Sequence, residues 1–237
     1  MKLSAPIFQL KRRAKLMARN KSIPLNEALD QVARDEGFAK WSLLSASMSS
    51  GTLSETILSR LEGGDLLLLA GRPGHGKTKL GLRLLVDAAR SGRKALLFTL
   101  ELTEQQARKH LKSLEADGAT IADGIQVFTS DEICADYIIQ HMSGLEPDTI
   151  AVIDYLQLLD QQRSKPALSE QLHALNEFAQ RTSVVLGFIT QIDRLFEAEG
   201  KRLPDIRDIR LPNFVDLGLF NKACFLHNGE AQLQDVA

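Results

Sequence analysis

Apolar positions along the chain predict an alternation of strands and helices from residue 65 onward. Short continuous apolar runs predict strands, and the segments between them carry apolar residues at helical spacing. The predicted strands are 65–70, 94–100, 125–128, 150–154 and 183–190, and the predicted helices are 77–91, 103–117, 131–145 and 168–181. Because continuous apolar strands are typical of sheets buried on both faces, this alternation indicates an α/β fold with a parallel sheet. Residues 222–233 predict a hairpin around Asn228-Gly229.

The first 45 residues have a different pattern. Helical spacing predicts two short helices at 6–20 and 24–37, with Pro24 suited to a first turn and Gly37 to a helix end. Residues 45–52 are rich in Ser and Gly and predict a linker. We therefore expect a small helical N-terminal piece, residues 1–45, and one α/β domain, residues 46–237.

Charge separates the two parts further. The whole chain of 237 residues has 29 Lys or Arg and 30 Asp or Glu, a net charge of −1, but residues 1–40 alone carry +5. A basic helical piece is compatible with contact to DNA through a helix-turn-helix arrangement. It is also compatible with docking or assembly, in which the basic side chains form only the solvated face of the first helix. Both interpretations remain open.

Composition excludes several classes of protein. No apolar run approaches the roughly 18 residues that a membrane-spanning helix needs, so no membrane association is expected. No secretory signal is recognisable, although an organellar transit peptide stays open. The two cysteines, Cys134 and Cys224, form neither a disulfide framework nor a zinc-binding spacing, which favours a reducing cytoplasm.

A phosphate-binding motif lies between the first predicted strand of the α/β domain and its helix. Residues 71–78 read GRPGHGKT and match G-x-x-x-x-G-K-[ST]. The candidate nucleotide-binding residues are Gly71, Arg72, Pro73, Gly74, His75, Gly76, Lys77 and Thr78. In this motif backbone N–H groups surround phosphate oxygens, the lysine reaches the β- and γ-phosphates, and the hydroxyl ligates Mg²⁺. ATP and Mg²⁺ are therefore the expected ligands, and His75, without an evident partner, is interpreted as a variable loop position.

Three further polar residues follow predicted strands. Asp154 ends the run 150–154, Glu101 follows 94–100 and Gln191 follows 183–190. Parallel strands end at one edge of a sheet, where carboxylates can hold a magnesium shell or orient water and an amide can touch the γ-phosphate. The alternatives are that the two acids are helix caps or solvated strand ends, and that Gln191 is an exposed loop residue.

Four blocks together resemble a known family. They are GDLLLLAGRPGHGKT at 64–78, LLFTLEL at 96–102, AVIDYLQLL at 151–159 and ITQIDR at 189–194. In this order they are similar to the motor domain of the DnaB-type replicative DNA helicases, within the RecA-like group of phosphate-loop ATPases. The resemblance covers roughly residues 50–237.

This resemblance implies a RecA-like fold, a mostly parallel twisted sheet with helices on both faces, and Mg²⁺-dependent ATP hydrolysis. It implies that Lys77 and Thr78 bind phosphate and Mg²⁺ and that Asp154 orients the metal shell. It further implies that Glu101 polarises the attacking water and that Gln191 senses the γ-phosphate.

The resemblance also implies a homo-oligomeric ring acting on single-stranded DNA, contacted by two loops. Their basic residues are Arg163, Lys165, Lys201, Arg202, Arg207 and Arg210. The alternative is that these side chains are merely solvated. The chain departs from the family pattern in its small N-terminal piece and in having Lys222 as the one Lys or Arg of residues 211–237. Unwinding therefore stays open, and an ATP-gated switch or assembly protein without helicase activity is the alternative function.

Overall fold

The computed structural model describes residues 7–21, 23–115, 120–160, 165–198, 201–210, 213 and 215–236. The chain divides into two compact units, Met1–Leu53 and Ser54–Ala237. Each unit has its own buried core. The motifs identified in the sequence all belong to the larger unit.

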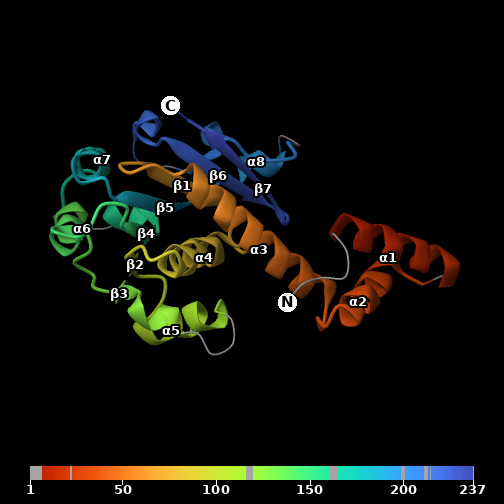
Figure 1. Ribbon diagram of the computed structural model, residues 1–237. Coiled ribbons are helices and arrows are strands. Elements are labelled where there is room, and N and C mark those ends of the chain that lie inside the picture. The colour runs from red at the N-terminus through yellow and green to blue at the C-terminus, as the bar shows by residue number, and fades with distance from the viewer. Residues whose placement is uncertain are drawn as a thin grey trace. The chain divides into compact units, whose positions relative to one another are not determined.

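The larger unit is built on a seven-stranded sheet (Figure 1). Its strands are β1 (Leu66–Gly71), β2 (Ala95–Thr99), β3 (Gln126–Phe128), β4 (Ile150–Asp154), β5 (Val185–Gln191), β6 (Lys222–His227) and β7 (Glu230–Asp235). The strand order is β3-β2-β4-β5-β1-β6-β7, and every pairing is parallel except that of β6 with β7. The predicted α/β fold with a mostly parallel sheet is therefore confirmed.

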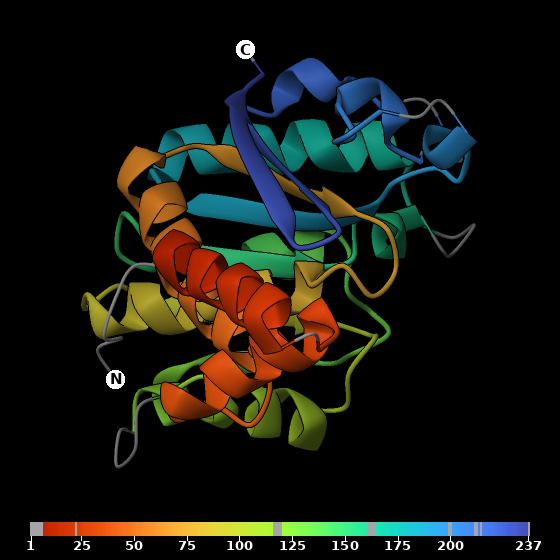
Figure 2. The ribbon, with the colours of Figure 1, turned by 90° about the vertical axis from the view of Figure 1, so that its right-hand side faces the viewer.

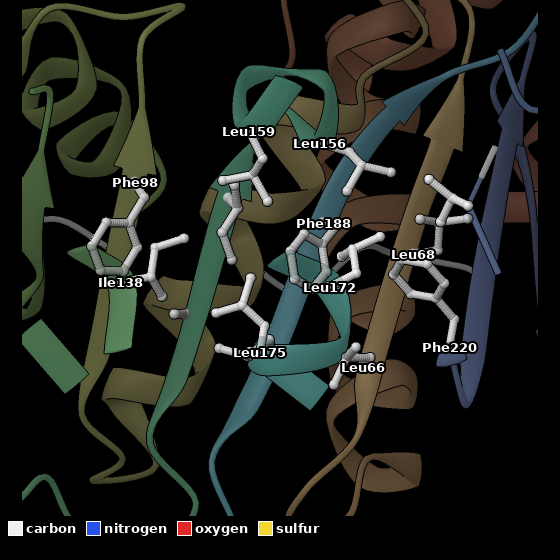
Figure 3. Packing of buried hydrophobic residues seen from close by; sticks show 14 of the residues in the cluster. Leu66, Leu68, Phe98, Ile138, Leu156, Leu159, Leu172, Leu175, Phe188 and Phe220 are labelled. Atoms are coloured by element: carbon white, nitrogen blue, oxygen red, sulfur yellow. The ribbon is translucent and has the colours of Figure 1, made fainter. Parts of the chain in front are cut away.

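Helices cover both faces of this sheet (Figure 2). α4 (Lys77–Arg90) lies against one face, where Gly81 leaves room for the side chains of Val152 and Ile189. A Cβ at position 81 would lie only 3.0 Å from Ile189 Cδ1 and 3.1 Å from Val152 Cγ1. On the other face, α6 (Ala135–Met142) and α7 (Leu168–Thr182) pack over the main apolar core (Figure 3).

The core follows the alternation of side chains along each strand. Leu66, Leu68 and Phe188 of the strands lie in one apolar cluster with Leu172 and Leu175 of α7 (Figure 3). Because β1, β2 and β4 are buried at every residue, each buries apolar side chains on both faces. This burial orders the carboxyl ends of the central strands, where the polar residues of interest lie.

Shorter elements connect these layers. They are the helices α5 (Glu104–Ser113) and α8 (Leu195–Ala198) and the 3-10 helices η1 (Ile121–Gly124), η2 (Leu156–Asp160), η3 (Ile206–Asp208) and η4 (Leu217–Leu219). α5 begins with a capping box in which Thr103 and Gln106 bond each other's backbone N–H groups. The helix predicted at 131–145 is shorter than expected, since Gly144 with a φ of 77° ends it.

The smaller unit contains α1 (Ile7–Lys21), α2 (Leu25–Asp35) and the first part of α3 (Trp41–Arg60). Its apolar core consists of Leu10, Ala14, Ala28, Val32, Ala33 and Leu44. Asp30 accepts a hydrogen bond from the Trp41 backbone N–H at 2.8 Å and so caps the start of α3. The two predicted N-terminal helices are confirmed.

The predicted linker at 45–52 is helical. These residues lie inside α3, and the division between the units falls after Leu53 rather than at residue 45. Ser and Gly each weaken a helix by only about 0.5–1 kcal/mol. The buried residues on either side of this segment belong to different units, Leu44 to the smaller one and Ile57 to the larger one. In the described part of the chain, no helix is long and apolar enough to cross a membrane.

Candidate active site

The loop after β1 adopts a conformation that requires glycine. Gly74 and Gly76 have φ values of 81° and 91°, in the left-handed region that other residues rarely occupy. Gly71 pairs with Leu226 of β6, and a Cβ at position 71 would lie 2.8 Å from the Leu226 carbonyl oxygen. The loop therefore turns tightly from β1 into α4, whose N-terminal N–H groups form a site suited to phosphate.

Lys77 lies at the centre of this loop. It is only 9% exposed, and its Nζ donates a hydrogen bond to the Arg72 carbonyl oxygen at 3.1 Å. Burial lowers the pKa of Lys77, while the nearby Asp154 carboxylate opposes this shift. The ammonium group is thus held inside the loop by a carbonyl, in a position where phosphate oxygens can replace that acceptor.

Asp154, the last residue of β4, is the neighbouring buried acid. It is 2% exposed and accepts a hydrogen bond from the Thr78 side chain, but its Oδ2 has no hydrogen-bond partner among the described residues. Burial raises the pKa of Asp154 to about 6, and the charge of Glu101 acts in the same direction. An unpartnered buried carboxylate oxygen beside a threonine hydroxyl fits Mg²⁺, which proteins usually hold through one or two carboxylates together with substrate phosphates.

Glu101 lies two residues beyond the end of β2. Its backbone N–H bonds the Thr99 hydroxyl at 3.1 Å, while its side chain is exposed. The carboxylate is near enough to act on the pKa values of both Asp154 and Lys77. With Thr78 it lines a cleft of about 450 Å³ between α4 and α5. An exposed carboxylate at this position can accept a proton from water.

Sheet topology explains why these residues meet. In the sheet β2, β4, β5 and β1 are consecutive neighbours, so their carboxyl ends form one edge. Lys77, Thr78, Asp154 and Glu101 gather there. Gln191 reaches the same edge, paired in register with Gly71, but its side chain lines a separate pocket of about 260 Å³ together with Tyr155, Gln157 and Arg210.

The phosphate loop is also tied to the end of β5. The Arg72 guanidinium donates to the Ile192 carbonyl at 3.3 Å, and the Ile192 N–H donates to the Gly71 carbonyl at 3.3 Å. A change at the loop therefore reaches the residue that follows Gln191 directly. Sequence reasoning did not reveal this contact, because nothing in the motif indicates which segment its arginine meets.

His75 has partners that its sequence context does not reveal. Its ring lies 4.9 Å from that of His227, centroid to centroid, and its Nδ1 accepts a weak hydrogen bond from the Asn228 N–H at 3.4 Å. His75 therefore has partners that the sequence does not make evident, while its interpretation as a variable loop position stays a prediction. The partners belong to the β6-β7 hairpin, and only the pairing of β6 with β1 brings them to the loop.

Most of the candidate DNA-contact cations are engaged within the protein. Lys165 donates to the carbonyls of Asp131 and Ile133 at 2.8 and 2.9 Å. The remaining pairs are Lys201 with Asp208, Arg202 with Glu230 and Arg207 with Asp205. Arg163 lies outside the described residues.

Arg210 differs from these cations. Among the described candidates, it is the one whose guanidinium makes no hydrogen bond or ion pair, and it lines the pocket beside Gln191. Its side chain is therefore available to an anion.

Comparisons with known proteins show the family to which the chain belongs. Residues 51–217 match the family model described as the KaiC ATPase. A probable replicative DNA helicase of Trieres chinensis is 26% identical over 200 residues, a match covering 70% of this chain and 44% of that protein. The chain thus spans less than half the length of this relative.

Solved structures show the same fold. One solved ATPase domain has a TM-score of 0.60 at 20% identity, over 76% of this chain and 75% of that one. A DnaB-like replicative helicase has a TM-score of 0.58 at 18% identity, over 93% and 67% of the two chains. A KaiC-like protein of Pyrococcus horikoshii OT3 has a TM-score of 0.51 at 17% identity, over 68% and 70%. The chain belongs to the KaiC ATPase family and has the RecA-like phosphate-loop fold of DnaB-like helicase motor domains.

Proposed function

We propose that this protein is a Mg²⁺-dependent ATPase that acts on single-stranded DNA as a homo-oligomer. The observation that carries the proposal is the meeting of Lys77, Thr78, Asp154 and Glu101 at one edge of the sheet. A phosphate loop alone binds a nucleotide, whereas a buried acid with an unpartnered oxygen and a second, exposed acid supply what hydrolysis requires.

Each residue has a distinct role in the proposed reaction. The loop N–H groups and Lys77 would hold the β- and γ-phosphates. Thr78 and Asp154 would hold Mg²⁺, which when bound would neutralise charge that develops on the phosphate oxygens. Glu101 takes a proton from a water molecule as the water oxygen attacks the γ-phosphorus. The bond from that phosphorus to the bridging oxygen breaks, which releases ADP and inorganic phosphate. Gln191, which ends β5 at the same edge in register with Gly71, is the proposed sensor of the γ-phosphate.

Single-stranded DNA is the proposed effector because of Arg210 and the kinship with a probable replicative helicase. Arg210 is an exposed arginine at the mouth of a polar pocket, a group that suits a phosphodiester without base reading. The ion-paired Lys201, Arg202 and Arg207 would have to give up their carboxylates to contact DNA. Arg210 is therefore the proposed first contact.

The test of the catalytic assignment is Glu101→Gln. This substitution keeps the size and shape of the side chain but replaces the carboxylate, which can take up a proton, with a neutral amide, so we expect ATP turnover to fall by about 10²-fold or more while nucleotide binding persists. Steady-state hydrolysis and fluorescent-nucleotide titration measure the two effects.

The controls for this test lie close by in the chain. Lys77→Ala serves as the blank for hydrolysis. Glu104→Gln, at an exposed acid of the adjacent helix that pairs with Arg108, should leave turnover unchanged. Unaltered hydrolysis in Glu101→Gln would remove that residue from the mechanism.

The DNA assignment is tested by the same assay with and without single-stranded DNA. Stimulation of about tenfold, equivalent to about 1.4 kcal/mol off the barrier, supports a DNA-coupled ATPase. Arg210→Ala should weaken DNA binding and make it less dependent on salt. An ATP turnover rate that is the same with and without single-stranded DNA would contradict this part of the proposal.

One observation favours an ATP-gated switch as a second candidate. Within the described part of residues 211–236 the one Lys or Arg is Lys222, and its ammonium is held by Asp65 and Asp235. It is thus a poor source of the in-trans cation that accelerates hydrolysis in related NTPases by about 10³–10⁵-fold. A switch would change its oligomeric state on binding Mg-ATP, and the Glu101→Gln variant should show the same change. Size-exclusion chromatography measures this change. Identical profiles with and without Mg-ATP would exclude the switch.

A further inference from the structure

Gln157 occupies a junction between three segments of the site. It lies in η2, three residues after Asp154, at the edge where β4 and β5 end. Its Nε2 donates one hydrogen bond to the Thr190 hydroxyl at 3.0 Å and another to the Arg210 carbonyl at 2.8 Å. One amide group thus joins the segment after β4, the end of β5 and the distant residue 210.

Arg210 is held from its other side by Gln191. The Arg210 N–H donates to the Gln191 carbonyl at 2.8 Å, and Ile209 forms an isolated antiparallel bridge with Ile192. The backbone of Arg210 is therefore fixed at both of its polar groups. One partner is the candidate γ-phosphate sensor, and the other is Gln157.

The surroundings of Gln157 leave its side chain acting as a hydrogen-bond donor. Thr190 is fully buried, so its hydroxyl has no access to solvent, and the Gln157 amide bonds it there. The Oε1 atom of Gln157 is itself buried and has no hydrogen-bond partner within the described chain. A side chain that uses only its donor end is suited to fixing two acceptors, the Thr190 hydroxyl and the Arg210 carbonyl, at a set distance from each other.

We propose that Gln157 is a positioning residue that couples nucleotide state at Gln191 to the Arg210 side chain. A shift of Gln191 on loss of the γ-phosphate moves the carbonyl that receives the Arg210 N–H. Gln157, three residues after Asp154, holds the carbonyl group of Arg210 in place. A movement of the Arg210 N–H therefore rotates the residue about its carbonyl and changes the direction of its side chain. The inference rests on the proposed function, since it takes Arg210 as the DNA contact.

The experiment compares Gln157→Met with the wild-type protein. Methionine has nearly the same length and volume but cannot donate the two hydrogen bonds. We measure the affinity for a fluorescent oligo-dT with and without a non-hydrolysable ATP analogue, and the ratio of ATP turnover with and without oligo-dT. Coupling between sites commonly amounts to about 5–150-fold, so we expect both ratios to fall by about fivefold in the variant.

The ratios distinguish coupling from simple structural damage. Damage to the DNA site weakens DNA binding equally in both nucleotide states and leaves the affinity ratio unchanged, which would overturn the proposal. Gln180→Met is the matched control, because Gln180 Nε2 also donates to a backbone carbonyl, that of Gly64, at 3.1 Å, but far from this edge. It should leave both ratios at the wild-type values.

A second variant covers the case in which Gln157→Met does not fold. Gln157→Glu keeps the shape and can still accept from Thr190, but it cannot donate to the Arg210 carbonyl, and it should likewise lower both ratios. Wild-type protein that shows no response to DNA would overturn the proposed function and this inference with it. Wild-type coupling that both folded variants retain would overturn the inference alone.

Discussion

At the scale of single residues, the site depends on polar groups that burial leaves incompletely paired. Lys77 bonds a backbone carbonyl in place of a phosphate, and the Oδ2 atom of Asp154 has no partner in the described part of the chain. An unsatisfied buried polar atom costs about 1–3 kcal/mol, so both groups gain when a ligand supplies the missing interactions. We therefore expect nucleotide binding to depend on the backbone conformation of the loop as well as on the charge of Lys77.

Gly74→Ala tests that geometry. The position has a φ of 81° and open space where a Cβ would lie, so the substitution introduces backbone strain of about 1 kcal/mol without a steric clash. The nucleotide-free loop of the variant can relax out of this conformation, which binding must then restore, so we expect ATP affinity to fall by about fivefold, as nucleotide titration would measure. Gly124→Ala is the matched control, since that glycine also has open space but no positive φ. Equal affinities for the two variants would contradict a strained loop.

At the scale of elements, α4 carries the loop lysine and is stabilised by ion pairs within the helix. Near its end the buried Asp87 accepts hydrogen bonds from Arg83 at 2.8 Å and Arg90 at 2.6 Å. The acid is 7% exposed, whereas the exposed pair Arg108 with Glu104 on α5 is solvated. Breaking a buried pair costs far more than breaking a surface pair, because the remaining groups stay desolvated.

Asp87→Ala should therefore destabilise the protein by about 1–3 kcal/mol, since both arginines keep partial access to water. Glu104→Ala, which removes the exposed pair, should change the free energy of unfolding by less than about 1 kcal/mol. Urea denaturation followed by circular dichroism measures both. Similar losses in the two variants would show that burial does not set the strength of these ion pairs.

At the scale of the whole molecule, two compact units share one helix. The family match, residues 51–217, lies almost entirely in the larger unit, and the basic α1 and α2 lie in the smaller one. Arg13 pairs with Asp35 within the smaller unit. The larger unit contains every residue that we assign to nucleotide binding, so we propose that it is the ATPase module by itself.

A fragment of residues 54–237 tests this division. We expect it to bind ATP as the full chain does, because the phosphate loop and both acids lie in a unit with its own core. Nucleotide titration and thermal melting provide the measurement. DNA affinity in the same fragment separates the interpretations of residues 1–53: unchanged affinity supports docking or assembly, whereas a loss with a shallower salt dependence supports DNA contact. A fragment that folds but fails to bind ATP would contradict an independent ATPase module.

Short stretches of the sequence predict many features of this protein. The apolar run at 150–154 predicts β4 residue for residue, and GRPGHGKT predicts the phosphate loop between β1 and α4. The positions of Glu101 and Asp154 at strand ends predict that both lie at one edge of the sheet, since parallel strands end at a common edge. These features depend on periodicity and on spacing between near neighbours, which a single sequence displays directly.

Contacts between distant residues depend instead on how the elements pack. His75 meets His227, and Gln157 holds Arg210, 53 positions further along the chain, only because β1 pairs with β6 and residues 209–210 return to the end of β5. The helix through 45–52 likewise runs against what its Ser- and Gly-rich composition predicts. Local preferences amount to about 1 kcal/mol per residue or less, whereas burying a large apolar side chain is worth about 1.5–3 kcal/mol, so packing overrides them.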